Sequence, residues 1–269
     1  MASPDSITPS QAARLIGTPA APVVVDVCLN EDFELDPRLI PGAIRQRHDD
    51  IPALLECIGE SRAIVYCQKG GKISQGAAAL LRCHGIKAAV LAGGQLAWVE
   101  HGLPLIPAER IPPRDESGHT RWVTRIRPKI DRIACPWLIR RFIDPGARFL
   151  FVSPSEVVAV AERFGATPFD IEGVYWSHRA DRCTFDTLLD EWTLETHALR
   201  RLASIVRAAD TDRHDLAPEA AGLLAISLGL SRMFRDDLEQ LEIGMAVYDA
   251  LYRWARDATE EKHDWPRGH

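Results

Sequence analysis

The sequence has no cysteine pair in a CxxC arrangement, although its 269 residues include six cysteines. Scattered cysteines in a chain of this length indicate neither a disulfide framework nor a zinc ribbon. No stretch of 18 or more apolar residues occurs, and the first residues lack a basic segment followed by an apolar core. We therefore expect no membrane-spanning helix, no signal peptide and a reducing, cytoplasmic environment.

An excess of positive charge is also absent, because the formal net charge is −6 at pH 7. This balance argues against a general nucleic-acid binder, and no helix-turn-helix or other nucleic-acid motif is visible. The composition, with 46% hydrophobic and 26% charged residues, is that of a globular protein. The length allows two domains of ordinary size.

The most informative stretch lies between residues 63 and 81. A short apolar run over 63–66 predicts a buried strand that leads Cys67 into a loop with two glycines and two lysines. Ser74 then opens an alanine- and leucine-rich helix. Free N–H groups at a helix start and nearby lysines favour negative charge, so the pattern predicts a Cys67 thiolate with a lowered pKa. The alternative is a buried cysteine that only fills space.

The surrounding segment predicts an α/β domain over residues 1–106. Apolar runs at 21–27, 63–66 and 88–91 alternate with helical segments at 8–16, 50–55, 74–84 and 95–101. This alternation is typical of a parallel sheet flanked by helices. Cys67 then falls at the C-terminal edge of the sheet, where such folds place their sites. Asp26, at the end of another strand, is expected to brace a loop.

Residues from about 8 to 106 resemble a rhodanese domain. The resemblance is carried, in order, by Val25-Asp26-Val27, Ile40-Pro41-Gly42-Ala43, the Cys67 loop, Leu91-Ala92-Gly93-Gly94, Trp98 and Gly102-Leu103-Pro104. It implies a rhodanese-like parallel sheet and a Cys67 that takes sulfur from a donor such as thiosulfate. The resulting persulfide would pass its sulfur to a thiol or cyanide-like acceptor. The loop residues expected to bind the substrate are Lys69, Gly70, Gly71, Lys72 and Ser74.

Two departures from related patterns narrow this interpretation. A protein phosphatase needs an arginine six residues after its cysteine to bind phosphate, and Ile73 stands there instead. Rhodanese domains often have an arginine two residues after the strand aspartate, whereas this chain has Cys28. Cys28 is either a second redox thiol or a buried structural cysteine.

The second half predicts a mainly helical α+β domain over residues 121–258. A proline-rich, polar linker over 107–120 precedes this domain, and a frayed tail over 259–269 follows it. The first strand, within 121–129, alternates apolar and basic residues, which indicates a half-exposed strand. A capping box at Ser153 predicts the start of a helix that runs to 164. The other predicted elements are a helix over 131–143, a strand over 147–152 and helices over 185–191, 195–209, 218–229 and 236–257.

Two features of this half concern ligands. Eight lysines and arginines lie between residues 121 and 148 against two acids, so this segment is either a solvated basic face or a surface for an oxyanion. His178, Cys183 and Asp186 lie within nine residues and could bind a metal ion, although no HxxxH or ExxH pair fixes a geometry. The alternative is that these residues satisfy backbone groups. No other cofactor is expected.

Residues from about 121 to 252 resemble the C-terminal domain of the chromate-resistance ChrB family. The motifs are Trp122-Val123-Thr124-Arg125, the segment Asp131–Asp144, Pro168-Phe169-Asp170, His178 with Cys183-Thr184-Phe185, Ala209-Asp210, Pro218-Glu219-Ala220 and Tyr248-Asp249-Ala250-Leu251. The two resemblances together favour a sulfurtransferase in a chromate-resistance or oxidative-stress context. One alternative is a sensor or regulator of chromate or oxidant stress. Another is a metal- or oxyanion-binding module with an inactive rhodanese domain.

Overall fold

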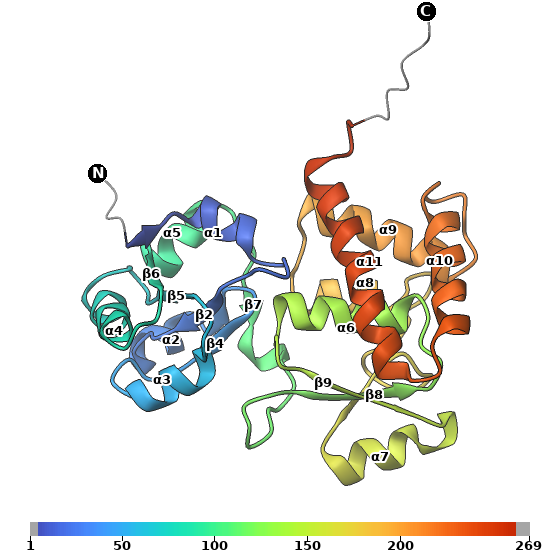
Figure 1. The fold of residues 1–269 in the computed structure, drawn as a ribbon, viewed down its shortest axis with the longest axis horizontal. Helices are drawn as coiled ribbons and strands as arrows, with labels where there is room; N and C mark the ends of the chain where they lie inside the picture. Colours follow the sequence, from blue (N-terminus) through green and yellow to red (C-terminus); the bar gives the residue numbers. More distant parts are fainter. Residues whose placement is uncertain (1–4, 262–269) are drawn as a thin grey trace, which may run out of the picture.

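A computed structural model of the protein describes residues 5–261. Figure 1 shows two domains side by side, the first built around a sheet and the second composed mainly of helices. This arrangement confirms the predicted fold class. The elements of the first domain are β1 (Ser6–Ile7), α1 (Pro9–Leu15), β2 (Val23–Asp26), α2 (Asn30–Leu35), β3 (Arg38–Leu39), β4 (Ala43–Arg45), α3 (Ile51–Ile58), β5 (Ala63–Tyr66), α4 (Lys72–Cys83), β6 (Ala88–Leu91), α5 (Gly94–Glu100) and β7 (Ile106–Pro107).

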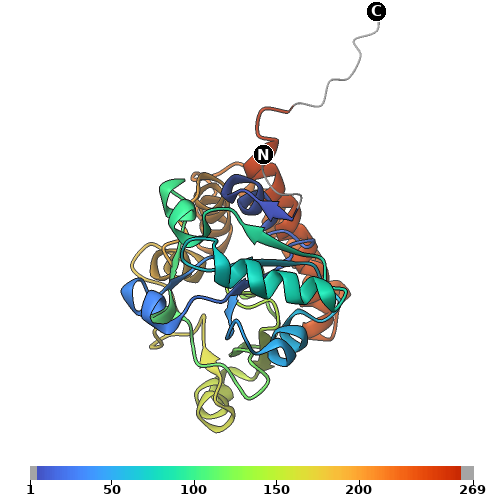
Figure 2. The same cartoon turned by 90° about the vertical axis from the view of Figure 1, so that its left-hand side faces the viewer.

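The first domain contains a five-stranded sheet in the order β1-β6-β5-β2-β4, with every neighbouring pair parallel. Its central strand β5 is buried along its whole length, because helices cover both faces. Figure 2, in which this domain faces the viewer, shows α4 lying across the sheet. A strand that is covered on both faces has no solvent-exposed side and therefore needs no polar residues, which is why the continuous apolar runs in the sequence predicted such strands.

The second domain places a small parallel sheet, in the order β10-β8-β9, beside a group of helices. It is preceded by a short 3-10 helix at Ala108–Arg110 that contacts this domain. Its elements are β8 (Arg121–Arg125), α6 (Asp131–Phe142), β9 (Arg148–Val152), a 3-10 turn (Pro154–Glu156), α7 (Val157–Phe164), β10 (Thr167–Pro168), α8 (Thr184–Glu191), α9 (His197–Asp210), α10 (Ala220–Met233) and α11 (Asp237–Asp257).

Two local predictions for this domain were wrong. The strand β8 is not half-exposed, because it is the middle strand of its sheet and its three central residues Trp122, Val123 and Thr124 are buried. The capping box at Ser153 does not form, because the chain first makes a 3-10 turn and the Ser153 side chain caps nothing. The first error arises because tertiary packing buries a strand that its sequence pattern indicates as half-exposed.

The two domains share one continuous hydrophobic core. The ring of Phe142, at the end of α6, packs against Gly17, and the amide of Gly42 donates to the Phe142 carbonyl at 2.5 Å. Gly42 immediately precedes β4, whereas Cys67 immediately follows β5. Because the strands are parallel, this contact with the second domain lies at the opposite edge of the sheet from Cys67.

Residues 106–120 are held between the two domains. The strand β7 pairs with β3, and the indole of Trp192 donates to the carbonyl of Arg110 at 3.0 Å. In the described part of the chain, no helix is both long enough and apolar enough to cross a membrane. Of the predicted tail, residues 262–269 lie outside the described residues.

Candidate active site

Cys67 lies directly after β5, where the chain leaves the C-terminal edge of the sheet. The loop 67–71 then leads into α4, whose N-cap is Gly71. The prediction that Ser74 opens this helix is therefore wrong, because the helix begins two residues earlier. Ser74 lies inside the first turn instead, where its buried Oγ is 3.2 Å from Cys67 Sγ.

Hydrogen bonds to the sulfur change the acidity of this thiol. Burial raises the pKa of Cys67, but hydrogen bonds from the Ser74 hydroxyl and from the amides of Ser74, Gly71 and Lys69 outweigh burial and lower the pKa below its usual value. The single proton of the Ser74 hydroxyl can reach either the sulfur or the Gly71 carbonyl, which is 3.3 Å away. A thiolate is the stronger acceptor because it carries a full charge. The structure thus agrees with the lowered pKa that the sequence predicted.

Two glycines let the Cys67 loop pack against the turn that follows β6. Gly70 and Gly94 have φ angles of +63° and +62°, which residues with a side chain rarely adopt. A Cβ atom at Gly94 would lie 2.1 Å from the Cys67 carbonyl oxygen. The same carbonyl accepts a hydrogen bond from the Gln95 amide at 3.1 Å. The turn therefore fixes the loop around the thiol, a contact that the sequence pattern did not reveal.

Lys69 and Lys72 are exposed beside this loop. Neither side chain is paired with a carboxylate within residues 5–261. Cys67 itself is only 6% exposed. The arrangement surrounds the sulfur with hydrogen-bond donors, and two exposed lysines lie within five residues of it in the sequence.

The neighbouring strand β2 ends in a second polar arrangement. The carboxylate of Asp26 is buried and accepts a hydrogen bond from the Cys28 amide at 2.8 Å, which confirms loop bracing. Burial first, and then the charge of Asp26, raises the pKa of Cys28 far above its usual value. Cys28 is therefore protonated at neutral pH, which counts against a second redox thiol.

Arg45, from β4, supplies the positive charge that the segment after Asp26 lacks. Its guanidinium donates to the Cys28 carbonyl at 2.8 Å and to the Asn30 side chain at 2.6 Å, and it lies 4.3 Å from the Phe33 ring centroid. A cavity of about 390 Å³ opens here, at the same edge of the sheet as Cys67. Local sequence spacing could not place Arg45 beside Cys28, because the two come from different strands.

A second group of polar side chains lies in the C-terminal domain. The Nε2 atom of His178 is 3.4 Å from Asp131 Oδ2, 3.3 Å from Asp170 Oδ1 and 3.2 Å from Asp210 Oδ2. These contacts, with Asp131 first, raise the pKa of His178 to about 12. Burial raises the pKa of Asp131 in turn. We call these four residues the His178 cluster.

The structure does not bring together the three metal-ligand candidates predicted from the sequence. Cys183 and Asp186 form the start of α8, where Asp186 accepts hydrogen bonds from the Cys183 amide at 3.1 Å and from its thiol at 3.4 Å. Asp186 also pairs with Arg182 and Arg207. His178 instead faces carboxylates that lie 47, 8 and 32 residues away in the sequence, a set that short-range spacing does not reveal.

Comparisons with known proteins match each half of the chain. Residues 8–101 match the rhodanese-like domain, and residues 122–255 match the ChrB C-terminal domain. A sulfurtransferase of Allochromatium vinosum is 31% identical over 87 residues, which are 32% of this chain and 81% of that protein. The chain belongs to the rhodanese family. Behind its rhodanese-like domain it carries a ChrB C-terminal domain.

Two further relatives cover separate halves of this rhodanese–ChrB chain. Protein ChrB of Cupriavidus metallidurans is 37% identical over 155 residues, 56% of this chain. The chain spans only 46% of the length of that protein. The solved structure of a rhodanese-related protein of Thermoplasma volcanium matches 38% of this chain and 96% of its own chain, with 24% sequence identity and a TM-score of 0.33.

The basic segment 121–148 of the ChrB domain does not form a free anion-binding surface. Six of its arginines pair with carboxylates from other parts of the chain. Arg121 and Arg148 pair with Asp115, Arg125 and Arg132 with Asp170, Arg140 with Glu242, and Arg141 with Asp249. Most of the local positive charge is therefore neutralised, which is why the uneven sequence distribution produced a misleading expectation.

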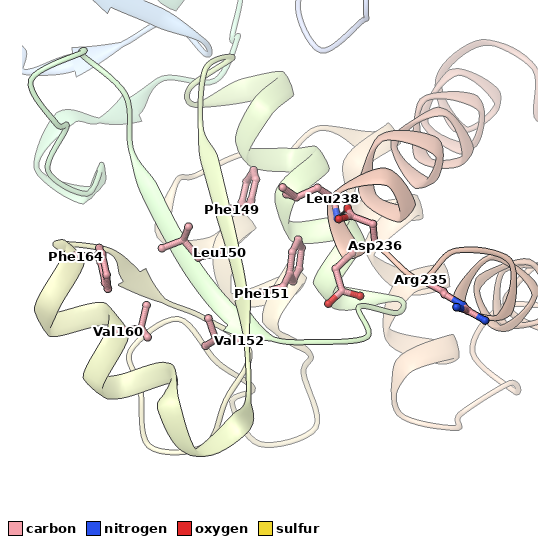
Figure 3. Close-up of a pocket in the computed structure, with 10 residues that line it drawn as sticks. Phe149, Leu150, Phe151, Val152, Val160, Phe164, Arg235, Asp236 and Leu238 are labelled. Atoms are coloured by element: carbon pink, nitrogen blue, oxygen red, sulfur yellow. Dashed lines mark hydrogen bonds between the residues drawn. The ribbon is translucent and has the colours of Figure 1, made fainter.

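An apolar groove of about 570 Å³ lies elsewhere in the ChrB domain, between β9, α7 and the start of α11. Figure 3 shows Leu150 and Val152 on the α7 side of the strand, and Phe149 and Phe151 on the α11 side. The nearby carboxylate of Asp236 caps α11 through the amides that follow it. This groove has no nucleophile among its lining residues and is not part of the Cys67 site.

Proposed function

We propose that the rhodanese-like domain is an active sulfurtransferase that carries sulfur as a persulfide on Cys67. The observation that carries this proposal is the set of donors around the sulfur, namely the Ser74 hydroxyl and three backbone amides. These donors stabilise the thiolate before the reaction and would stabilise an anionic outer sulfur after it. The membership of the rhodanese family supports the same chemistry.

The reaction balances without any external oxidant. The Cys67 thiolate attacks the outer sulfur of thiosulfate, the S–S bond of thiosulfate breaks, and sulfite leaves with the electron pair. An acceptor such as cyanide or a thiolate then attacks the outer sulfur of the persulfide. The electron pair of that S–S bond returns to Cys67, which becomes a thiolate again.

The loop residues have different roles in binding the donor and stabilising the sulfur. Lys69 and Lys72, exposed and unpaired within the described residues, attract an anionic donor and offset the charge of departing sulfite. Gly70 lets the loop pack against the turn after β6, and at Gly71 no atom lies within 4 Å of an added Cβ, so a donor can approach the backbone amides there. Ser74 acts on the sulfur itself. The ChrB domain suggests that this activity serves a chromate-resistance or oxidative-stress context.

Thiosulfate:cyanide turnover by the wild type and by Cys67→Ser tests this function. We expect turnover only with Cys67 present, since serine cannot form a persulfide. Mass spectrometry after thiosulfate treatment should find an adduct of about 32 Da, one sulfur atom, on the Cys67 peptide. Cys83→Ser, which removes an exposed cysteine at the end of α4, is the matched control and should keep full activity. Equal rates for wild type and Cys67→Ser would refute the proposal.

A further inference from the structure

We propose that the His178 cluster of the ChrB domain binds one divalent first-row metal ion through His178, Asp131, Asp170 and Asp210. Four different parts of the chain contribute these side chains. Asp131 is the first residue of α6, Asp170 follows β10, His178 lies in the loop before α8, and Asp210 is the last residue of α9. The fold therefore brings the four together from positions far apart in the sequence.

The geometry fits ligands of one cation better than hydrogen-bonded partners. A ring nitrogen carries at most one hydrogen, so at most one of the three contacts of His178 Nε2 can be an ordinary two-centre hydrogen bond. The three N···O separations are 3.2 to 3.4 Å. Ligands bound at about 2.1 Å from a shared ion lie about 3.0 Å apart in an octahedral arrangement and about 3.4 Å apart in a tetrahedral one. One ligand atom each from Asp131, Asp170 and His178 lies within 4.8 Å of the other two, and Asp210 joins this group through its 3.2 Å separation from His178 Nε2.

The charge balance independently points to a cation. Asp131 is completely buried, yet its only cationic partner within ion-pair distance in the described residues is His178. Asp210, whose side chain is 19% exposed, also has His178 as its only cationic partner within ion-pair distance in residues 5–261. Arg125 and Arg132 both pair with Asp170. Two carboxylates thus share a single imidazole, and removing carboxylate charge from water is costly unless a cation compensates it.

Groups behind the cluster hold the carboxylates in position. The amides of Thr184 and Phe185 donate to the two oxygens of Asp131 at 2.6 and 3.3 Å, and the Thr184 hydroxyl donates to Asp170 Oδ1 at 2.9 Å. Such outer partners orient metal ligands and keep them deprotonated. On the outer side, Asp170 and His178 line a cavity of about 290 Å³, which gives an ion and water a way in.

The donor set selects the kind of metal. Three carboxylates and one imidazole suit Mn²⁺, Fe²⁺ or Zn²⁺, whereas a nitrogen ligand disfavours Ca²⁺ and Mg²⁺. The thiol of Cys183 is directed at Asp186, so the set lacks the soft ligand that Cu(I) requires. The site is separate from Cys67, and its occupancy does not depend on sulfur transfer.

The test is metal content and Mn²⁺ binding of the full-length, tag-free protein. After chelation and dialysis, titration with MnCl₂ followed by electron paramagnetic resonance should show about one bound Mn²⁺ per chain. His178→Gln and Asp131→Asn should each weaken binding more than about tenfold. Cys183→Ser and His214→Gln are the controls and should bind as the wild type does. His214 pairs with a carboxylate, Asp212, but lies outside the cluster.

Three outcomes would overturn the inference. One is the absence of stoichiometric Mn²⁺ and Zn²⁺ binding by the wild type. A second is equal binding by the wild type and His178→Gln, which would assign the metal to groups outside the cluster, for example His263 and His269, which every variant retains. Visible d–d absorption of the Co²⁺-loaded wild type provides a measurement that depends on no variant, and its absence would also contradict the site.

Discussion

At the scale of single residues, the reactivity of Cys67 depends on Ser74. The sulfur and the hydroxyl are 3.2 Å apart, and both groups are buried. A hydrogen bond to a charged group contributes about 1.5 kcal/mol or more, so its loss corresponds to roughly one pKa unit. Ser74 was predicted from the sequence to open the helix and to bind the substrate, but its direct contact with the sulfur follows from the early start of α4.

Ser74→Ala should therefore raise the pKa of Cys67 by about one unit. Because the thiolate is the reactive form and is lost as pH falls through the pKa, alkylation of Cys67 at pH values below the midpoint should slow about tenfold in this variant. The measurement is the pH dependence of iodoacetamide labelling, read by mass spectrometry at the Cys67 peptide. The exposed Cys83 is the internal reference. An unchanged midpoint would mean that the backbone amides alone set this pKa.

At the scale of elements, the site depends on the contact between the Cys67 loop and the start of α5. Gly94 has φ +62°, and its Cα faces the Cys67 carbonyl so closely that a Cβ would overlap the oxygen. Backbone atoms form this obstacle, so no rotation of a flexible side chain can relieve it. Gly76, on α4, offers the opposite situation because no atom lies within 4 Å of an added Cβ.

Gly94→Ala should displace the Cys67 loop, with a loss of about 2 to 4 kcal/mol in the free energy of unfolding and a large fall in sulfurtransferase turnover. Gly76→Ala should leave turnover intact and stabilise the protein by up to about 1 kcal/mol, because alanine favours the helix. Denaturant unfolding and the thiosulfate:cyanide assay check both variants. Wild-type turnover and stability in Gly94→Ala would show that the loop tolerates displacement.

At the scale of the whole molecule, the shared core predicts coupled unfolding of the two domains. Phe142 is nearly buried and joins the aromatic cluster of the ChrB domain to Gly17 of the rhodanese-like domain. We expect one calorimetric transition in the wild type. Phe142→Ala should cost about 3 kcal/mol or more, which for a protein of this size lowers Tm by roughly 6 to 12 °C.

The matched control for this prediction is Phe164→Ala, at the exposed end of α7, where 55% of the residue is accessible. Its effect on Tm should be small, because little apolar surface leaves the core. Two separate transitions in the wild type would contradict coupling. A second transition that appears only in Phe142→Ala would support it, since that substitution weakens the contact between the domains.

Much of the rhodanese-like domain was predictable because its signals are local. Covered strands appear as continuous apolar runs, helices begin at residues such as Thr8 and Asp50 that cap them through their own side chains, and Cys67 follows a strand directly. The candidate site was predictable in part, because the thiol and its donors all lie between residues 67 and 74. The contribution of Gly94 was missed because it comes from another segment.

The amino-acid sequence alone thus determined the alternation of strands and helices in the first domain, the position of Cys67 at the end of a strand and its tendency to be a thiolate. All three depend on residues within a few positions of one another. Only the tertiary structure decided which charges remain free, because the arginines of 121–148 find their carboxylate partners far along the chain. It also decided the partners of His178, because the four residues of the cluster come from separate segments and their spacing in the sequence does not reveal that they are in contact.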